Sequence, residues 1–143
     1  MRLALCLIVL SLAPAALGSE RAGTIKTSAG SAHIIRAGAV LPAAPGDAVM
    51  VSDSIQTGRD GTVGITLMDD TRLTAGPDSL MELSRFVFDT TTHAGSLDTR
   101  VKRGSLGVIS GKIAKSNPDN VRFSTSAVTL GVRGTRFIIK TGQ

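Results

Sequence analysis

Residues 62–67 read Thr-Val-Gly-Ile-Thr-Leu, so that branched apolar residues alternate with small or polar ones. This period of two is typical of a β-strand that buries one face and exposes the other. The pattern predicts that Val63, Ile65 and Leu67 point into a hydrophobic core while their neighbours face solvent.

The chain after Ala22 continues in short apolar runs rather than with the 3.6-residue period of a helix. The further runs that we interpret as strands are Ile25–Ser28, His33–Arg36, Leu80–Leu83, Phe86–Phe88, Leu97–Val101, Leu106–Ile109, Val121–Thr125, Val128–Leu130 and Phe137–Lys140. Turn residues such as Gly95, Gly104 and Gly131 separate them at short intervals. The sequence therefore predicts a single all-β domain of many short strands, an irregular β-solenoid or β-sandwich with little helix.

The core of this domain is expected to be mainly aliphatic, because the chain has four phenylalanines and no tryptophan or tyrosine. Besides the three apolar residues of the strand at 62–67, the side chains that we expect to be buried are Leu106, Val108, Phe123, Val128 and Phe137.

The first eighteen residues have the features of a secretory signal peptide. A basic start precedes an apolar run, Leu3–Leu12, which is shorter than the roughly 20 residues of a membrane-spanning helix. We expect cleavage after Gly18, which leaves one domain at residues 19–143 and removes Cys6, the only cysteine. The mature protein is therefore expected to be soluble, without a disulfide, and periplasmic or secreted.

Charge is unevenly distributed along the chain, which has a net charge of +5. Residues 19–90 carry six Lys/Arg and nine Asp/Glu, whereas residues 91–143 carry nine Lys/Arg and two Asp/Glu. Either the acidic strands pack beside the basic ones, or the basic face binds an anionic envelope component. Nucleic acid is not expected as a partner, because the protein is exported and has no tyrosine or tryptophan to stack on bases.

Motifs of catalysis are missing from the sequence, which holds no nucleophile elbow, phosphate-binding loop or zinc-protease signature. His33 and His93 lie sixty residues apart, so each is expected to be an exposed or singly hydrogen-bonded side chain. We expect no catalytic residue, cofactor or metal, and a hydrolase using two aspartates is the weakest hypothesis.

Aspartates are concentrated in the middle of the chain, at Asp47, Asp53, Asp60, Asp69, Asp70 and Asp78. Each lies beside glycine, proline, serine or another aspartate, where a carboxylate accepts a hydrogen bond from a turn N–H. Turn formation is the expected role of most of them. The Asp69-Asp70 pair is where a weak cation site would be least surprising.

The most distinctive string, Gly-Val-Arg-Gly-Thr, stands between two apolar strands near the end of the chain. Its glycines allow a sharp turn that aims a guanidinium at one place. In one interpretation Arg133, Gly134 and Thr135 contact a partner or ligand. In the other, which we favour, the arginine makes a bidentate bond to a strand-end carboxylate, such as Asp47 or Asp53, and staples the last strands to the first.

Several motifs follow one another along most of the chain. In order they are Arg36 in an opening strand, Gly46-Asp47, Asp53-Ser-Ile55, Thr57-Gly58, Asp60-Gly61, the strand Thr62–Leu67, Asp70-Thr-Arg-Leu73, Pro77, Ser79-Leu-Met-Glu-Leu83, Leu106, Thr125-Ser-Ala-Val128 and Val132-Arg-Gly-Thr135. In this order and spacing, the segment Gly30–Ile139 resembles the FecR domain, the periplasmic module of bacterial cell-surface signalling regulators. The resemblance implies a β-solenoid-like architecture and a binding role in a Gram-negative envelope.

Two features depart from the family pattern. Asp70 stands where members usually have glycine, so its hairpin needs an aspartate in a less favourable conformation. The full regulators carry a cytoplasmic anti-sigma segment and a membrane helix before this domain, whereas we expect a stand-alone exported domain here. The resemblance alone does not carry over the signalling role.

The sequence thus favours a non-enzymatic, exported binding module. In the first hypothesis it is a protein-interaction or signal-relay component, in which an exposed strand edge pairs with a strand of an envelope protein. The alternative is a module that binds a ligand, a surface polysaccharide or another anionic polymer through its basic C-terminal face.

Overall fold

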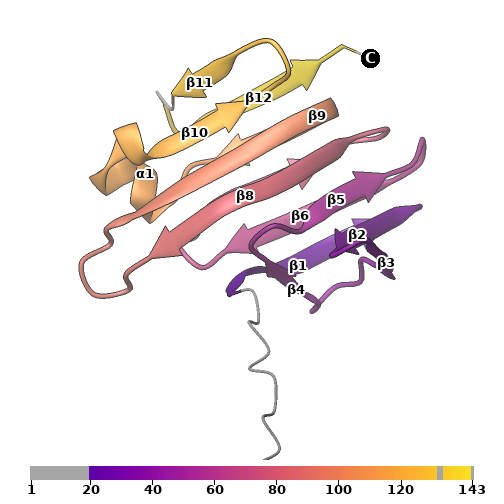
Figure 1. The fold of residues 1–143 in the computed structure, drawn as a ribbon, viewed down its shortest axis with the longest axis horizontal. Helices are drawn as coiled ribbons and strands as arrows, with labels where there is room; N and C mark the ends of the chain where they lie inside the picture. Colours follow the sequence, from indigo (N-terminus) through magenta and orange to yellow (C-terminus); the bar gives the residue numbers. More distant parts are fainter. Residues whose placement is uncertain (1–19, 132–133, 143) are drawn as a thin grey trace, which may run out of the picture.

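A computed structural model describes residues 20–131 and 134–142 of the chain. Strands hold 60% of the described residues and helices 7%, which confirms the predicted all-β class. The strands follow one another in a curled sheet that doubles back over itself (Figure 1).

One half of this sheet is built from seven strand segments. In spatial order they are β3 (Ala39–Pro42), β2 (Ala32–Arg36), β5 (Ser54–Thr57), β8 (Leu80–Phe88), the first part of β9 (Gly95–Ile109), β10 (Val121–Ser124) and β11 (Thr129–Gly131). Neighbours are antiparallel except β9 and β10, which run parallel. The parallel pair needs a crossover, which α1 (Lys112–Ser116) and the short 3₁₀ helix η1 (Pro118–Asn120) supply.

The other half contains six segments, all antiparallel. In spatial order they are β4 (Ala48–Met50), β1 (Arg21–Ala29), β6 (Thr62–Leu67), β7 (Arg72–Ala75), the second part of β9, and β12 (Arg136–Thr141). Within the described residues, the halves end in β3 and β4 on one side and in β11 and β12 on the other.

Strand β9 joins the halves because it changes partners along its length. Its first part pairs with β8 and β10, and its second part pairs with β7 and β12. Gly104, expected to lie in a turn between two strands, instead lies inside β9 with φ 84°. A Cβ atom at this position would lie 2.6 Å from Ser79 Cα and 2.7 Å from the Asp78 carbonyl oxygen. Glycine therefore lets one continuous strand pass from one half to the other.

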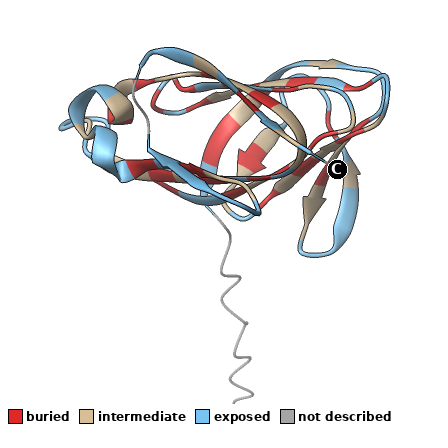
Figure 2. Cartoon of the chain, turned by 90° about the horizontal axis from the view of Figure 1, so that it is seen from above, coloured by how far each residue is buried: buried red, intermediate tan, exposed pale blue. Residues whose placement is uncertain are grey.

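The buried apolar side chains form a single hydrophobic cluster, and Figure 2 shows the buried positions along the strands of the sheet. The predicted core residues that are buried in it are Val63, Ile65, Leu67, Leu106, Val108 and Phe123. Phe137 is half-buried and packs edge-on against Phe123, with ring centroids 5.4 Å apart. The prediction for Val128 is wrong, because this side chain is 52% exposed. It lies in the turn before β11, where its carbonyl accepts the Thr125 N–H at 2.8 Å.

The hairpin between β6 and β7 confirms that Asp70 adopts the less favourable backbone conformation expected from the sequence. Asp70 has φ 68°, in the left-handed region where glycine is more readily accommodated. The neighbouring Asp69 is fully buried, and its carboxylate accepts hydrogen bonds from the N–H and hydroxyl of Thr71. It also accepts the Ile113 N–H at 3.3 Å, which anchors α1 to the hairpin.

Candidate binding surfaces

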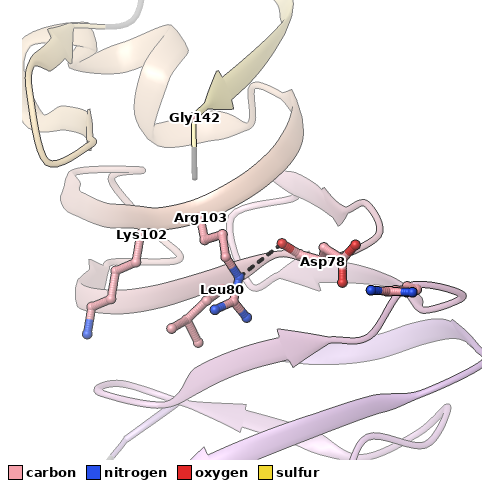
Figure 3. A pocket seen from close by; sticks show the side chains of 6 residues that line it. Asp78, Leu80, Lys102, Arg103 and Gly142 are labelled. Atoms are coloured by element: carbon pink, nitrogen blue, oxygen red, sulfur yellow. Dashed lines mark hydrogen bonds between the residues drawn. The ribbon is translucent and has the colours of Figure 1, made fainter.

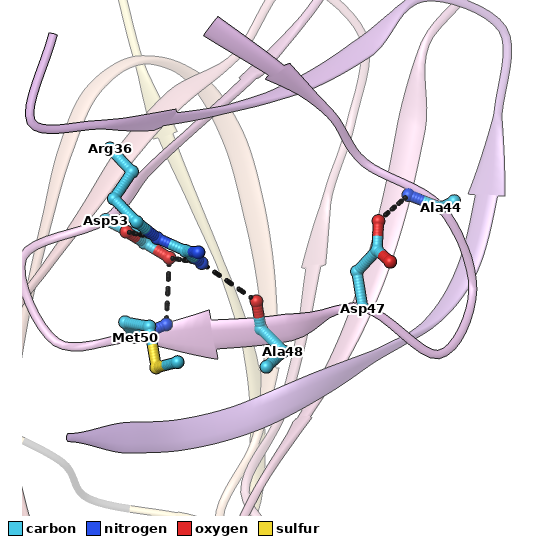
Figure 4. A network of polar contacts seen from close by, with 6 residues as sticks. All are labelled: Arg36, Ala44, Asp47, Ala48, Met50 and Asp53. Atoms are coloured by element: carbon cyan, nitrogen blue, oxygen red, sulfur yellow. Dashed lines mark hydrogen bonds and ion pairs between the residues drawn. The ribbon is translucent and has the colours of Figure 1, made fainter. Parts of the chain in front are cut away.

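An arginine–aspartate pair links β2 to β4 on the side of the fold that carries β3 and β4 (Figure 4). Arg36, the last residue of β2, donates from Nε and Nη2 to the two carboxylate oxygens of Asp53, at 2.9 and 2.8 Å. The same Nη2 donates to the Ala48 carbonyl of β4 at 3.1 Å. Asp53 is 1% exposed and also accepts the Met50 N–H at 2.8 Å. The bond to Asp53 raises the pKa of Arg36 above its ordinary value.

This pair bears on the favoured interpretation of Arg133. A bidentate staple on Asp53 exists, and the arginine that makes it is Arg36. Asp47, the other carboxylate offered to Arg133, is exposed and accepts the Ala44 N–H at 2.9 Å. Arg133 itself lies outside the described residues, so its role stays a prediction.

Turn aspartates behave largely as the sequence suggested. Asp60 accepts the Ser31 N–H at 3.2 Å, and the bonds to Thr71 and Ile113 occupy the carboxylate of Asp69. Asp70 instead forms an ion pair with Lys112 at 3.2 Å. The two adjacent carboxylates are thus directed to N–H, hydroxyl and ammonium donors. No group of three or more potential metal-ligating side chains occurs in residues 20–131 and 134–142.

The described part of the Gly131–Thr135 string is tied to the end of β9. The Gly134 carbonyl accepts the Ser110 hydroxyl at 3.1 Å, and the Thr135 carbonyl accepts the Ser110 N–H at 2.8 Å. Gly134 has φ 114°, and a Cβ atom there would meet no neighbouring atom within 4 Å. Gly134 and Thr135 therefore lead into β12 along an open surface.

The edge formed by β12 is open in the described part of the chain, where this strand pairs with β9 alone. Its side chains alternate, so that Phe137 and Ile139 face the core while Arg136, Ile138 and Lys140 are exposed. Ile138 is 68% exposed, more than any other large apolar residue in the structure's described ranges. The sequence signal for it is Phe-Ile-Ile, in which the middle isoleucine interrupts the alternation of apolar and polar residues.

Backbone hydrogen bonding at this edge follows from the strand register. Ser110 and Thr135 are directly opposite and joined by the N–H to carbonyl bond at 2.8 Å. In an antiparallel pair, such bonded positions recur at every second residue. Phe137 and Ile139 therefore turn their N–H and C=O groups toward β9. The intervening residues 136, 138 and 140 turn theirs toward the open edge.

A basic cleft of about 390 Å³ lies where β9 changes sheet halves (Figure 3). Its lining residues are Arg59, Asp78, Leu80, Lys102, Arg103 and Gly142. Arg103 donates from Nε to the Asp78 carbonyl at 3.2 Å, which orients its guanidinium. Lys102 pairs with Glu82 at 3.0 Å, and this hydrogen bond lowers the pKa of Glu82. The fold thus adds Arg59, from the acidic half of the sequence, to two cations of the basic half.

These features define a class of protein, a small all-β module. An ion pair staples one side of this module, and the other side has an open strand edge. The family model described as FecR protein matches residues 53–143, more than half of the chain, and the chain therefore belongs to the FecR family. No curated protein and no solved structure matches the chain.

Family membership points to a signalling-regulator module of a generally non-enzymatic family, whose domains are periplasmic in those regulators. The matched range begins at Asp53, so Arg36 and strands β1 to β4 precede it. None of the helices in residues 20–131 and 134–142 is long and apolar enough to span a bilayer.

Proposed function

We propose that this chain is an exported, non-enzymatic binding module that relays a signal by binding another protein of the cell envelope. The open edge of β12 is the observation that carries this proposal. An extended segment of a partner adds a strand to such an edge, and main-chain hydrogen bonds then supply affinity that side-chain pockets make specific. FecR membership supports a signalling role for the interaction.

Arg133, Gly134 and Thr135 belong to the same proposed surface. Gly134 and Thr135 immediately precede β12 and are exposed, so a partner strand on β12 would pass beside them. In this role Gly134 and Thr135 form one end of the proposed binding edge.

Proline at position 138 tests the proposal selectively. The N–H of Ile138 points away from β9, so Ile138→Pro removes a donor of the open edge and leaves every β9 bond in place. Phe137→Pro is the matched control for disruption of the fold, because it removes an N–H that donates a hydrogen bond to β9. We expect Ile138→Pro to melt close to the parent protein and Phe137→Pro to melt well below it.

Binding is measured with a photo-crosslinking residue placed at position 138 or, as a control, at Thr74. Thr74 is exposed on β7, where it is paired with Gly64 of β6 on one side and Gly107 of β9 on the other. We expect a discrete adduct with one envelope protein from position 138, competed by unlabelled parent protein and not by Ile138→Pro. Equal adducts from both positions, or equal competition by the proline variant, would contradict the proposal.

Export itself is part of the proposal and rests on residues 1–18. Intact mass of the protein from a periplasmic extract should correspond to a chain that begins at Ser19. A mass that includes residues 1–18, or one raised by a lipid, would contradict export as a soluble protein.

A second candidate function is binding of an anionic surface polymer, and the basic cleft favours it. Two arginines and a lysine border the cleft beside Leu80, which offers an apolar contact to the carbon face of a sugar. Arg103→Gln should weaken binding to a polyuronate and flatten its salt dependence. Arg72→Gln, an exposed arginine on β7, is the control. Equal binding by both variants would remove the cleft from consideration.

A further inference from the structure

We infer that the strand accepted by β12 is acidic, with a carboxylate, an apolar residue and a second carboxylate at successive positions on its exposed face. This inference rests on the proposed function and names the chemistry of the partner. It follows from three properties that Arg136, Ile138 and Lys140 share. Their side chains are exposed, their backbone N–H and C=O groups face the open edge, and together they form a basic–apolar–basic pattern.

The exposed side chains and the free backbone groups of this edge belong to the same three residues. A strand that pairs with the free groups of residues 136, 138 and 140 places its own alternate side chains directly opposite theirs. Opposite charges then face Arg136 and Lys140, and an apolar side chain covers Ile138, which is 68% exposed. Because the required pattern is symmetrical, parallel and antiparallel partner strands satisfy it equally.

A second copy of the chain is disfavoured as the occupant. Two copies paired antiparallel about Ile138 would set Arg136 against the second copy's Lys140, and like charges directly opposite are destabilising. Charged residues on an edge strand are a known protection against this kind of self-association. Residues 19–143 carry 15 Lys/Arg and 11 Asp/Glu, and this net positive charge adds to the preference for an acidic partner.

The core-facing side of the β12 edge favours a partner strand with apolar inward side chains. Phe137 is only half-buried beside Phe123, and Leu130 of β11 is 40% exposed. The inward side chains of an added strand would lie next to Phe137. Apolar residues between the two carboxylates therefore extend the core.

Three short peptides test the inference against isotope-labelled protein. The acidic probe is Ser-Glu-Val-Ile-Val-Glu-Ser, the neutral analogue has glutamine in place of both glutamates, and the basic analogue has lysine. We expect the acidic probe to shift the amide signals of Arg136, Ile138 and Lys140. Its binding should be about three- to tenfold tighter than that of the neutral analogue at low salt, and this ratio should shrink as salt is added.

Charge reversal provides the matched variant. Arg136→Glu combined with Lys140→Glu changes two exposed side chains and should leave the amide spectrum of the core in place. This double variant should prefer the basic analogue over the acidic probe.

These experiments distinguish failure of the acidic-partner inference from failure of the proposed function. Equal binding of acidic and neutral peptides at the same amides, without a reversal in the double variant, would overturn the acidic partner and leave strand addition intact. If no peptide moves these amides and Ile138→Pro still competes for the envelope adduct, both the inference and the proposed function are wrong.

Discussion

The guanidinium of Arg36 holds both carboxylate oxygens of Asp53, and its Nη2 also reaches the Ala48 carbonyl at 3.1 Å. One side chain thereby joins β2, β4 and the segment that enters β5. At the opposite side of the fold, β11 and β12 end the two sheet halves within the described residues. The staple and the proposed binding edge therefore lie on opposite sides of the domain.

Loss of Arg36 should destabilise the protein strongly. Arg36→Ala leaves the buried carboxylate of Asp53 without its cation, and we expect the free energy of unfolding to fall by about 3–5 kcal/mol in urea denaturation. Arg36→Lys should recover only part of this, because an ammonium group cannot form the two parallel bonds. The exposed Arg72 is the control, and a loss no larger than that of Arg72→Ala would refute the staple.

Loss of Arg133 should have little effect on stability. Asp53 already has Arg36 as its partner and Asp47 is exposed, so neither carboxylate needs a second arginine. We expect Arg133→Ala to melt within a few degrees of the parent and to reduce formation of the crosslinked adduct. A drop in melting temperature as large as that of Arg36→Ala would restore the staple interpretation that the sequence favoured.

Two glycines of β9 should respond differently to alanine. Gly104 has φ 84°, and its Cβ would lie 2.6 Å from Ser79 Cα, so Gly104→Ala should cost at least about 1–2 kcal/mol of unfolding free energy. Gly107 lies in the same strand, and the nearest atoms to its Cβ would be 3.8 Å away. Gly107→Ala should therefore be tolerated. Similar urea midpoints for the two variants would contradict the bend at Gly104.

Truncation of three apolar residues should follow their burial. Phe123 is 1% exposed, so Phe123→Ala should cost about 3–5 kcal/mol of unfolding free energy. Phe137→Ala should cost less, since this ring is half-buried. Ile138→Ala should stay within about 0.5 kcal/mol of the parent. An equally large loss at position 138 would mean that this residue supports the fold rather than the binding edge.

The turn between β8 and β9 should make stability depend on pH in the acid range. Backbone N–H groups of Thr92 and Thr91 hydrogen-bond the Asp89 carboxylate and hold its pKa below the ordinary value. In the unfolded chain the pKa of aspartate is about 3.9. The stabilising effect is therefore fully present above that pH and is lost as pH falls through the lower, folded pKa.

Asp89→Asn should remove this part of the acid dependence, which urea denaturation from neutral pH down to acid pH can measure. Titration of the Asp89 carboxylate by NMR provides a direct check. A pKa at or above the ordinary aspartate value in the folded protein would contradict the hydrogen-bonded turn.

Local sequence patterns determined much of the fold. Alternation at residues 62–67 placed Val63, Ile65 and Leu67 in the core correctly, because the two faces of a strand follow from chain geometry alone. The strands that the pattern missed are β3, β4, β5 and β7, each of three or four residues. A segment of that length covers at most two repeats of the strand period, so it becomes a strand mainly through hydrogen bonds to distant partners.

Tertiary structure alone decided which neighbours each strand has, and the proposed binding surfaces depend on those neighbours. Alternation in β12 implies that Ile138 and Ile139 face opposite ways, but not that the strand lies at an open edge. Glycine at position 104 is compatible with a turn or with a bend inside a strand, and its contact with Ser79 decides between them. The arginine that pairs with Asp53 is chosen by the approach of β2 to β4. Such long-range contacts are set by the free energy of the whole core, to which any short segment contributes only a part.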